Sequence, residues 1–133
     1  MKRGQVATEY LLLVGIAFLA IIPIFYYSIS SSAKTVRFNE AEDFVTTISK
    51  TADRVYALGP GSQDYIKVTI PGDTKEIIFD RNEVILKMSV NGKISDVFAI
   101  SRTNLTGSVS TSSGSKHIYV KTLSNGTVEV GEL

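Results

Sequence analysis

A run of 18 residues without a charge, from position 10 to position 27, constrains this chain more than any other feature. As a helix it would extend roughly 27 Å, which is close to the thickness of the hydrocarbon core of a bilayer. Lys2 and Arg3 precede the run, and no basic residue follows it until Lys34. The run therefore predicts a membrane-inserted helix with a cytoplasmic N-terminus and the rest of the chain outside.

Two simpler interpretations of this run can be weighed. A secretory signal peptide has an apolar core of about 7–15 residues that ends at a small-residue cleavage site. The run here is longer and ends in Phe25, Tyr26 and Tyr27. A plain signal anchor stays open as an alternative. Glu9 argues against it, because an ionisable group at that depth is costly and is typical of a functional position.

The residues before the apolar run carry a second pattern. Lys2-Arg3-Gly4 is a short basic leader, Gln5 follows it, and Glu9-Tyr10 opens the apolar run. The pattern resembles the class III signal peptide of archaeal type IV pilin precursors, over the first quarter of the chain. The resemblance implies that a prepilin peptidase cuts an extended leader between Gly4 and Gln5. It also implies that Lys2 and Arg3 supply the leader charge, and that Gln5, Glu9 and Tyr10 act in assembly.

The same resemblance implies a structural function. The mature chain would be one subunit of a cell-surface filament, a helical homopolymer held together by the apolar helices and used for adhesion. Its partners would be copies of itself, the prepilin peptidase, and the assembly ATPase with its membrane platform. The precursor would sit in the cell membrane and the product in an extracellular pilus. An archaellin, disfavoured by the spacing of Gln5 and Glu9-Tyr10, and a minor pilin that presents a binding domain remain alternatives.

A helical pattern continues beyond the apolar run. Apolar residues spaced by three and four form a seam along one side: Phe38, Ala41, Val45, Ile48, Ala52 and Val55. Charged residues such as Glu42 and Asp43 fall off this seam and are expected to face solvent. Leu58 closes the pattern, and the following Gly59-Pro60-Gly61 is a strong helix stop. Pro23 predicts a mild kink, or alternatively a flexible joint.

After Pro60 the hydrophobic period changes to two, which predicts strands. We expect strands near 64–70, 75–80, 83–90, 93–101, 116–123 and 127–131, mostly antiparallel, with hairpin signals at Asn91-Gly92 and Asn125-Gly126. The stretch 106–115 consists almost entirely of Ser, Thr and Gly and is expected to be an exposed loop.

The expected fold is therefore α+β: a long N-terminal helix, membrane-spanning in its first half, with an antiparallel β-sheet packed around its second half, as in type IV pilins. We divide the chain into a cleaved leader (1–4), a transmembrane or filament-core helix (5–27), an amphipathic continuation of that helix (28–58) and a globular β domain (59–133).

The sequence offers little chemistry for catalysis. It contains no cysteine and a single histidine, His117, which we expect to be an ordinary surface residue. No nucleophile triad or phosphate-binding loop is suggested, so we expect no enzyme, no metal site and no cofactor. The net charge of +1 gives no electrostatic basis for binding nucleic acid. Asn104 and Asn125 begin N-glycosylation sequons, and Asn125 is also explained as a turn residue.

Overall fold

The computed structural model describes residues 2–133, so Met1, the first residue of the expected leader, lies outside the described residues. One helix, α1, runs from Lys2 to Leu58. It continues through Pro23 without interruption, so Pro23 does not melt it. The expectation that 2–4 is extended is wrong: these residues are helical. They contain no proline, and the Thr8 hydroxyl donates to the Gly4 carbonyl oxygen at 2.9 Å, as helical geometry allows.

The C-terminal end of α1 follows from its glycine. Gly59 adopts a φ of 99°, a left-handed conformation that only glycine enters without steric cost. Its N–H donates to the carbonyl oxygen of Tyr56 at 3.1 Å, which satisfies one of the last helical acceptors. The predicted stop at 59–61 is confirmed.

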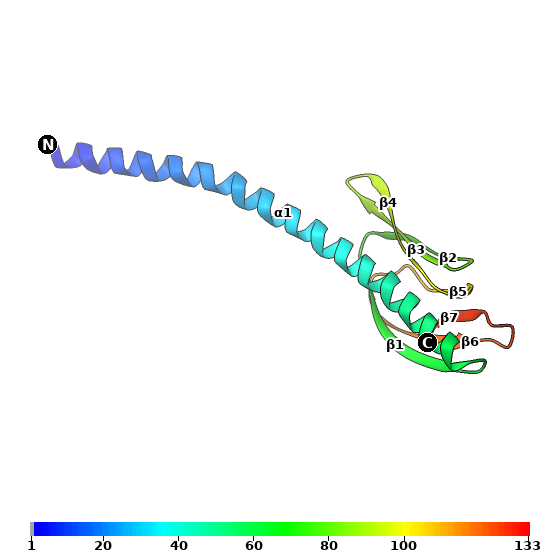
Figure 1. Cartoon of the computed structure of the whole chain (residues 1–133). Helices are drawn as coiled ribbons and strands as arrows, with labels where there is room; N and C mark the ends of the chain where they lie inside the picture. Colours follow the sequence, from blue (N-terminus) through cyan, green and yellow to red (C-terminus); the bar gives the residue numbers. More distant parts are fainter. Residues whose placement is uncertain (1) are drawn as a thin grey trace. The chain divides into compact units, whose positions relative to one another are not determined.

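By its internal contacts the chain divides into two compact units, Met1–Thr35 and Val36–Leu133. The second unit contains the last part of α1 and seven strands, which Figure 1 labels. They are β1 (Gln63–Ile70), β2 (Thr74–Asp80), β3 (Glu83–Val90), β4 (Lys93–Ile100), β5 (Leu105–Ser108), β6 (Gly114–Thr122) and β7 (Val128–Glu132).

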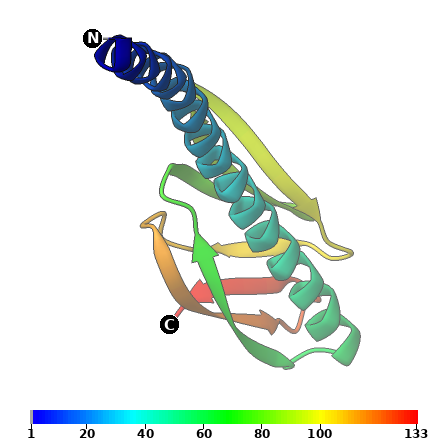
Figure 2. The ribbon, with the colours of Figure 1, turned by 90° about the vertical axis from the view of Figure 1, so that its left-hand side faces the viewer.

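The strands form two sheets, with the orders β1-β6-β7-β5 and β2-β3-β4. All pairings are antiparallel except that of β5 with β7. Figure 2 shows residues 36–58 of α1 lying in front of strands of both sheets. The predicted α+β fold, a long helix packed against a largely antiparallel β domain, is thus confirmed, although its strands divide between two sheets.

The hydrophobic core lies between the last part of α1 and the inner faces of both sheets. The helix contributes Ala41, Phe44, Val45, Ile48, Ala52 and Val55. The strands contribute residues such as Val68, Leu86, Met88, Ile118, Val120 and Val130. The predicted seam is confirmed from Ala41 to Val55.

The prediction of the seam is wrong at both ends, where the side chains are exposed. Phe38 is 37% exposed and Leu58 is 72% exposed. Phe38 precedes the first buried helical residue by almost one turn, and Leu58 is the last residue of the helix, so each lies at the margin of the covered stripe. Phe44 was not part of the predicted seam, but its side chain is buried.

The expectation of a loop over 106–115 is also wrong in part. Residues 106–108 belong to β5, which pairs in parallel with β7, and 114–115 belong to β6. Val109 is buried. The polar stretch can form a strand because its backbone groups pair with β7, and Gly107 is needed there. A Cβ on that residue would lie 1.8 Å from the carbonyl oxygen of Val130.

Candidate functional site: an uncovered apolar helix and its polar head

The first unit exposes an unusual amount of apolar side chain. Within residues 2–35 every residue is exposed, and this part of α1 is long and apolar enough to cross a membrane. We call the segment 10–29 the apolar stem. Its large exposed apolar residues are Tyr10, Leu11, Leu12, Leu13, Val14, Ile16, Phe18, Leu19, Ile21, Ile22, Ile24, Phe25, Tyr26, Tyr27 and Ile29.

The apolar stem has no polar side. Leu11, Leu12, Leu13 and Val14 follow one another, and four consecutive helical residues point in directions about 100° apart, so they cover the whole circumference. A helix that lies flat on a surface would show a charged face instead. At about 25 cal/mol per Å² of apolar area, such a stem is strongly driven out of water. Its cover must come from lipid or from other polypeptide chains.

We call residues 2–9, which precede the apolar stem, the polar head of this helix. The head and the first residue of the stem contain the residues that the sequence singled out. Lys2, Arg3, Gln5, Glu9 and Tyr10 all lie in the first turns of α1 and are exposed. Gln5 and Glu9 are four residues apart, which places them on the same side of the helix. Glu9 is the one charged residue between Arg3 and Lys34, and it takes part in none of the ion pairs among residues 2–133.

The helix itself does not require a glycine at position 4. A Cβ built on it would meet no atom within 4 Å, and its backbone is not in the left-handed region. The fold therefore tolerates a side chain at this position. Any requirement for glycine at position 4 must come from something that binds this part of the chain.

The two sequons differ in their surroundings. Asn104 is exposed between Thr103 and the start of β5, and its side chain makes no hydrogen bond among the described residues. Asn125 is exposed in the turn between β6 and β7, where its side-chain oxygen accepts a hydrogen bond from the N–H of Thr127 at 3.0 Å. The turn explains Asn125 by itself, whereas Asn104 has no such local role.

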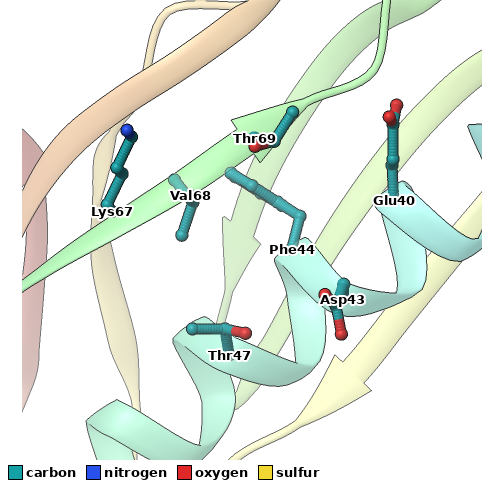
Figure 3. A pocket seen from close by; sticks show the side chains of 7 residues that line it. All are labelled: Glu40, Asp43, Phe44, Thr47, Lys67, Val68 and Thr69. Carbon is teal, nitrogen blue, oxygen red and sulfur yellow. The ribbon is translucent and has the colours of Figure 1, made fainter.

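A groove of about 190 Å³ lies between α1 and β1. Figure 3 shows Phe44 and Val68 beside it, with Glu40, Asp43 and Thr47 on the helix and Lys67 and Thr69 on the strand. The side chains of Glu40 and Asp43 point away from each other in this view. Nothing in the groove pairs a nucleophile with a base, which leaves it without a recognisable catalytic arrangement.

His117 is exposed on β6. Among residues 2–133 no three His, Cys, Asp or Glu side chains come close enough to hold a metal ion. Among residues 2–133, Glu132 is the one titratable group with a clear shift of its pKa. The hydrogen bond from Lys116 at 2.5 Å, helped by the Ser110 N–H, holds the pKa of its carboxyl below the usual value.

Sequence reasoning missed one polar site in the second unit. Asp53 is half-buried rather than solvated, and its carboxylate accepts hydrogen bonds from the Ser101 hydroxyl and the Arg102 N–H, both at 2.7 Å. Ser49 similarly donates to the carbonyl oxygen of Ile100 at 2.7 Å. Both contacts join α1 to the end of β4. The partner residues are about 50 positions away in the chain, so no local signal could have found them.

Comparison of the chain with protein-family models, with curated proteins and with solved structures finds no match in any of the three.

Proposed function

We propose that this chain is the structural subunit of a type IV pilus-like surface filament of the archaeal kind, and that it has no catalytic activity. The observation that carries the proposal is the apolar stem: it is uncovered on every side, yet it belongs to the same helix that forms the core of a folded β domain. Before assembly, such a subunit can insert its stem into lipid. After assembly, the stem can pack against the stems of other copies.

The small residues of the stem region support packing between helices. Gly15, Ala17 and Ala20 let neighbouring helices approach closely, as does Ala7 in the head. A Cβ on Gly15 would meet no atom within 4 Å, so the chain itself does not require this glycine. The same composition also suits a single helix in lipid, so the small residues favour assembly only in combination with the head.

The proposed assembly needs the partners that the leader implies. A prepilin peptidase would remove 1–4 and leave the stem in the mature chain. Moving the stem from lipid into a filament exchanges one apolar surrounding for another, so burial alone supplies little net drive. Extraction therefore calls for an external motor, the role of the assembly ATPase and its membrane platform. The precursor would reside in the cell membrane and the product in an extracellular filament that serves adhesion, without nucleic acid or a cofactor.

Glu9 is the residue that we assign to assembly. In a filament core an unpaired carboxylate would cost several kcal/mol. After cleavage the nearest cation is the new amino group of Gln5, its own or that of a neighbouring copy. A contact between Glu9 and a neighbour's amino group would form only when the incoming subunit has reached the correct axial position. Tyr10 would lie beside this contact.

Glycosylation is a further part of the proposal. Asn104 is the better candidate because its side chain is exposed and makes no hydrogen bond among the described residues, whereas the side chain of Asn125 stabilises its turn. An archaellin, or a minor pilin with a binding domain, would share the stem. An abundant homopolymer in sheared surface filaments favours the pilin subunit over the minor pilin, and a rotating, swimming filament would favour the archaellin.

Processing gives the sharpest test. The mature subunit should lack residues 1–4 by intact mass, and Gly4→Val should accumulate as an uncut membrane precursor. Thr35→Val is the control, because it changes an exposed residue of the same helix outside both the leader and the apolar stem. The proposal fails if the mature chain begins inside or after the stem, or if Gly4→Val is cleaved and assembled normally.

The role of Glu9 is tested separately from processing. Glu9→Gln keeps the size and polarity of the side chain but removes the charge, so cleavage should be normal while the yield of filaments falls. Loss of cleavage would assign Glu9 to recognition by the peptidase, and normal filaments would leave it without a role in assembly.

A further inference from the structure

The outer face of the β2-β3-β4 sheet is apolar although it points away from the core. Ile78, Ile85 and Phe98 lie directly opposite one another on the three strands. None of the three belongs to the core or packs against it, and Phe98 is 60% exposed. Ile94 and Ile100 of β4 are exposed on the same face. We call this surface the isoleucine face.

Charged residues border the isoleucine face, and most of them are acidic. On one side Glu76, Lys87 and Asp96 form a cross-strand row, with Lys87 and Glu76 3.8 Å apart. On the other side Asp80 lies directly opposite Glu83. Two like charges in that position destabilise a sheet, and neither has an ion-pair partner among residues 2–133. Four carboxylates against one lysine make this face a surface for a basic partner.

The β1-β6-β7-β5 sheet carries two tyrosines, two lysines and a single carboxylate, that of Glu129, on its outer face. Tyr65 lies opposite Tyr119, and Lys67 lies opposite His117. Lys121 faces both Gln63 and Glu129 across its two neighbouring strands. Lys67 and Lys121 appear in no ion pair among the described residues. We call this surface the tyrosine face.

The tyrosine face is also hollowed. A shallow depression of about 560 Å³ lies beside Tyr119. Its lining includes Gly131 and two carboxylates, those of Glu129 and Glu132, and Glu132 is paired with Lys116. The Tyr119 ring lies over Gly131 so closely that a Cβ there would come within 2.4 Å of it. An exposed aromatic ring such as Phe98 would find both an apolar neighbour and room in this depression.

We propose that the isoleucine face of one copy docks on the tyrosine face of the next copy. The inference rests on the proposed function, because it assigns the contact between β domains within the filament. The faces are complementary in charge, because four carboxylates and one lysine on the isoleucine face meet two lysines and one carboxylate on the tyrosine face. They are also complementary in shape, an apolar ridge against an aromatic hollow. Because the two faces differ, the contact is head-to-tail, and such a contact repeats from copy to copy instead of stopping at a dimer.

Charge reversal in the full-length chain tests this pairing of faces. The variant Lys67→Glu/Lys121→Glu should lower the yield of sheared filaments about tenfold, and Asp80→Lys/Glu83→Lys should do the same. All four changes together should restore the yield, because the charges are then exchanged between the faces. Lys50→Glu, at an exposed helical position outside both faces, is the control for a change of charge alone. Protease resistance of the β domain in detergent verifies that each variant is folded.

The outcomes separate this inference from the proposed function. If wild-type chains form no filaments, the proposed function fails and the docking fails with it. If wild-type filaments form and the reversed variants assemble equally well, only the docking is overturned. If the fourfold variant is not rescued, the tyrosine face is not the partner. Greater retention of Asp80→Lys/Glu83→Lys in the membrane, without rescue, would assign the isoleucine face to lipid headgroups.

Cysteine pairs give a second test, since the chain has no cysteine of its own. Phe98→Cys together with Tyr65→Cys in one chain should give, on treatment with a short bismaleimide, a ladder of covalent multimers from filaments. Each single variant should stay monomeric under the same treatment. Dimers from Phe98→Cys alone would instead show that the isoleucine face meets its own copy, which contradicts the head-to-tail contact.

Discussion

The two parts of α1 are both helical, but they differ in whether their side chains are buried by the rest of the chain. Residues 2–35 have no buried side chain, whereas residues 36–58 bury Ala41, Phe44, Val45, Ile48, Ala52 and Val55 among others. The apolar stem within the first part is apolar on all sides, and the second part has an apolar stripe with polar residues around it. The chain therefore uses helical structure twice, once as a core element of a domain and once as a surface that requires a partner.

Removing residues 1–27, which hold nearly all of the apolar stem, should have the largest effect. A fragment of residues 28–133 should be a soluble monomer at low concentration with a cooperative unfolding transition, because its helical stripe and both sheets cover one another. Gel filtration and urea unfolding provide the measurement. A fragment without a cooperative transition would show that the β domain depends on the apolar stem, and the comparison would break down.

An isoleucine-to-alanine change in each part of the helix sharpens the comparison. Ile48 is fully buried and Ile22 is 62% exposed. Ile48→Ala should lower the free energy of unfolding of the β domain by about 2–5 kcal/mol, because it removes buried methyl groups and leaves a cavity. Ile22→Ala, its matched control, should leave that free energy unchanged. Urea unfolding in mild detergent, followed by protease resistance of the domain, measures both. Equal effects would contradict the separation into two units.

Two aspartates of residues 36–58 allow a similar comparison, between a carboxylate that accepts hydrogen bonds and one that is exposed. Asp53→Ala should destabilise the β domain by about 1–3 kcal/mol, since the Ser101 hydroxyl and the Arg102 N–H lose their acceptor. Asp43→Ala removes an exposed carboxylate of the same helix that takes part in no ion pair among residues 2–133, and it should change little. The same unfolding measurement applies. A similar loss in both variants would mean that helix charge, and not the hydrogen bonds, is responsible.

The smallest expected effect is on the stability of the fold at acidic pH. The pKa of Glu132 is lowered chiefly by its hydrogen bond with Lys116, so the folded state prefers the ionised carboxylate. That stabilisation is fully present above the ordinary carboxyl pKa of about 4.5 and is lost as the pH falls through the lower pKa of the folded state.

Melting temperatures measured across this range should show a shallower acid decline in Glu132→Gln than in the wild type. Glu129→Gln is the control on the same strand. Identical acid profiles for wild type and Glu132→Gln would show that the Lys116 contact does not stabilise the fold.

Much of the local structure was predictable because local residues decide it. The uncharged run and the spacing of Ala41, Val45 and Ile48 indicate a helix, and Gly59 indicates its end, through interactions within one or two turns. The strands were likewise predictable from alternation and from turns such as Asn91-Gly92, where Asn91 adopts a φ of 53° and Gly92 a φ of 75°. The sequence also located the polar head of the helix, since its pattern is contiguous.

Only the tertiary structure decided which strands pair and what their outer faces become. Leu105–Ser108 forms a strand because β7 offers it a parallel partner, and the composition of that stretch gives no sign of it. Ile78, Ile85 and Phe98 meet in one row only through the register of three strands, just as Asp53 meets Ser101 only through the packing of α1. These contacts join residues distant in the chain, and their free energy depends on a register and a burial that no local segment determines.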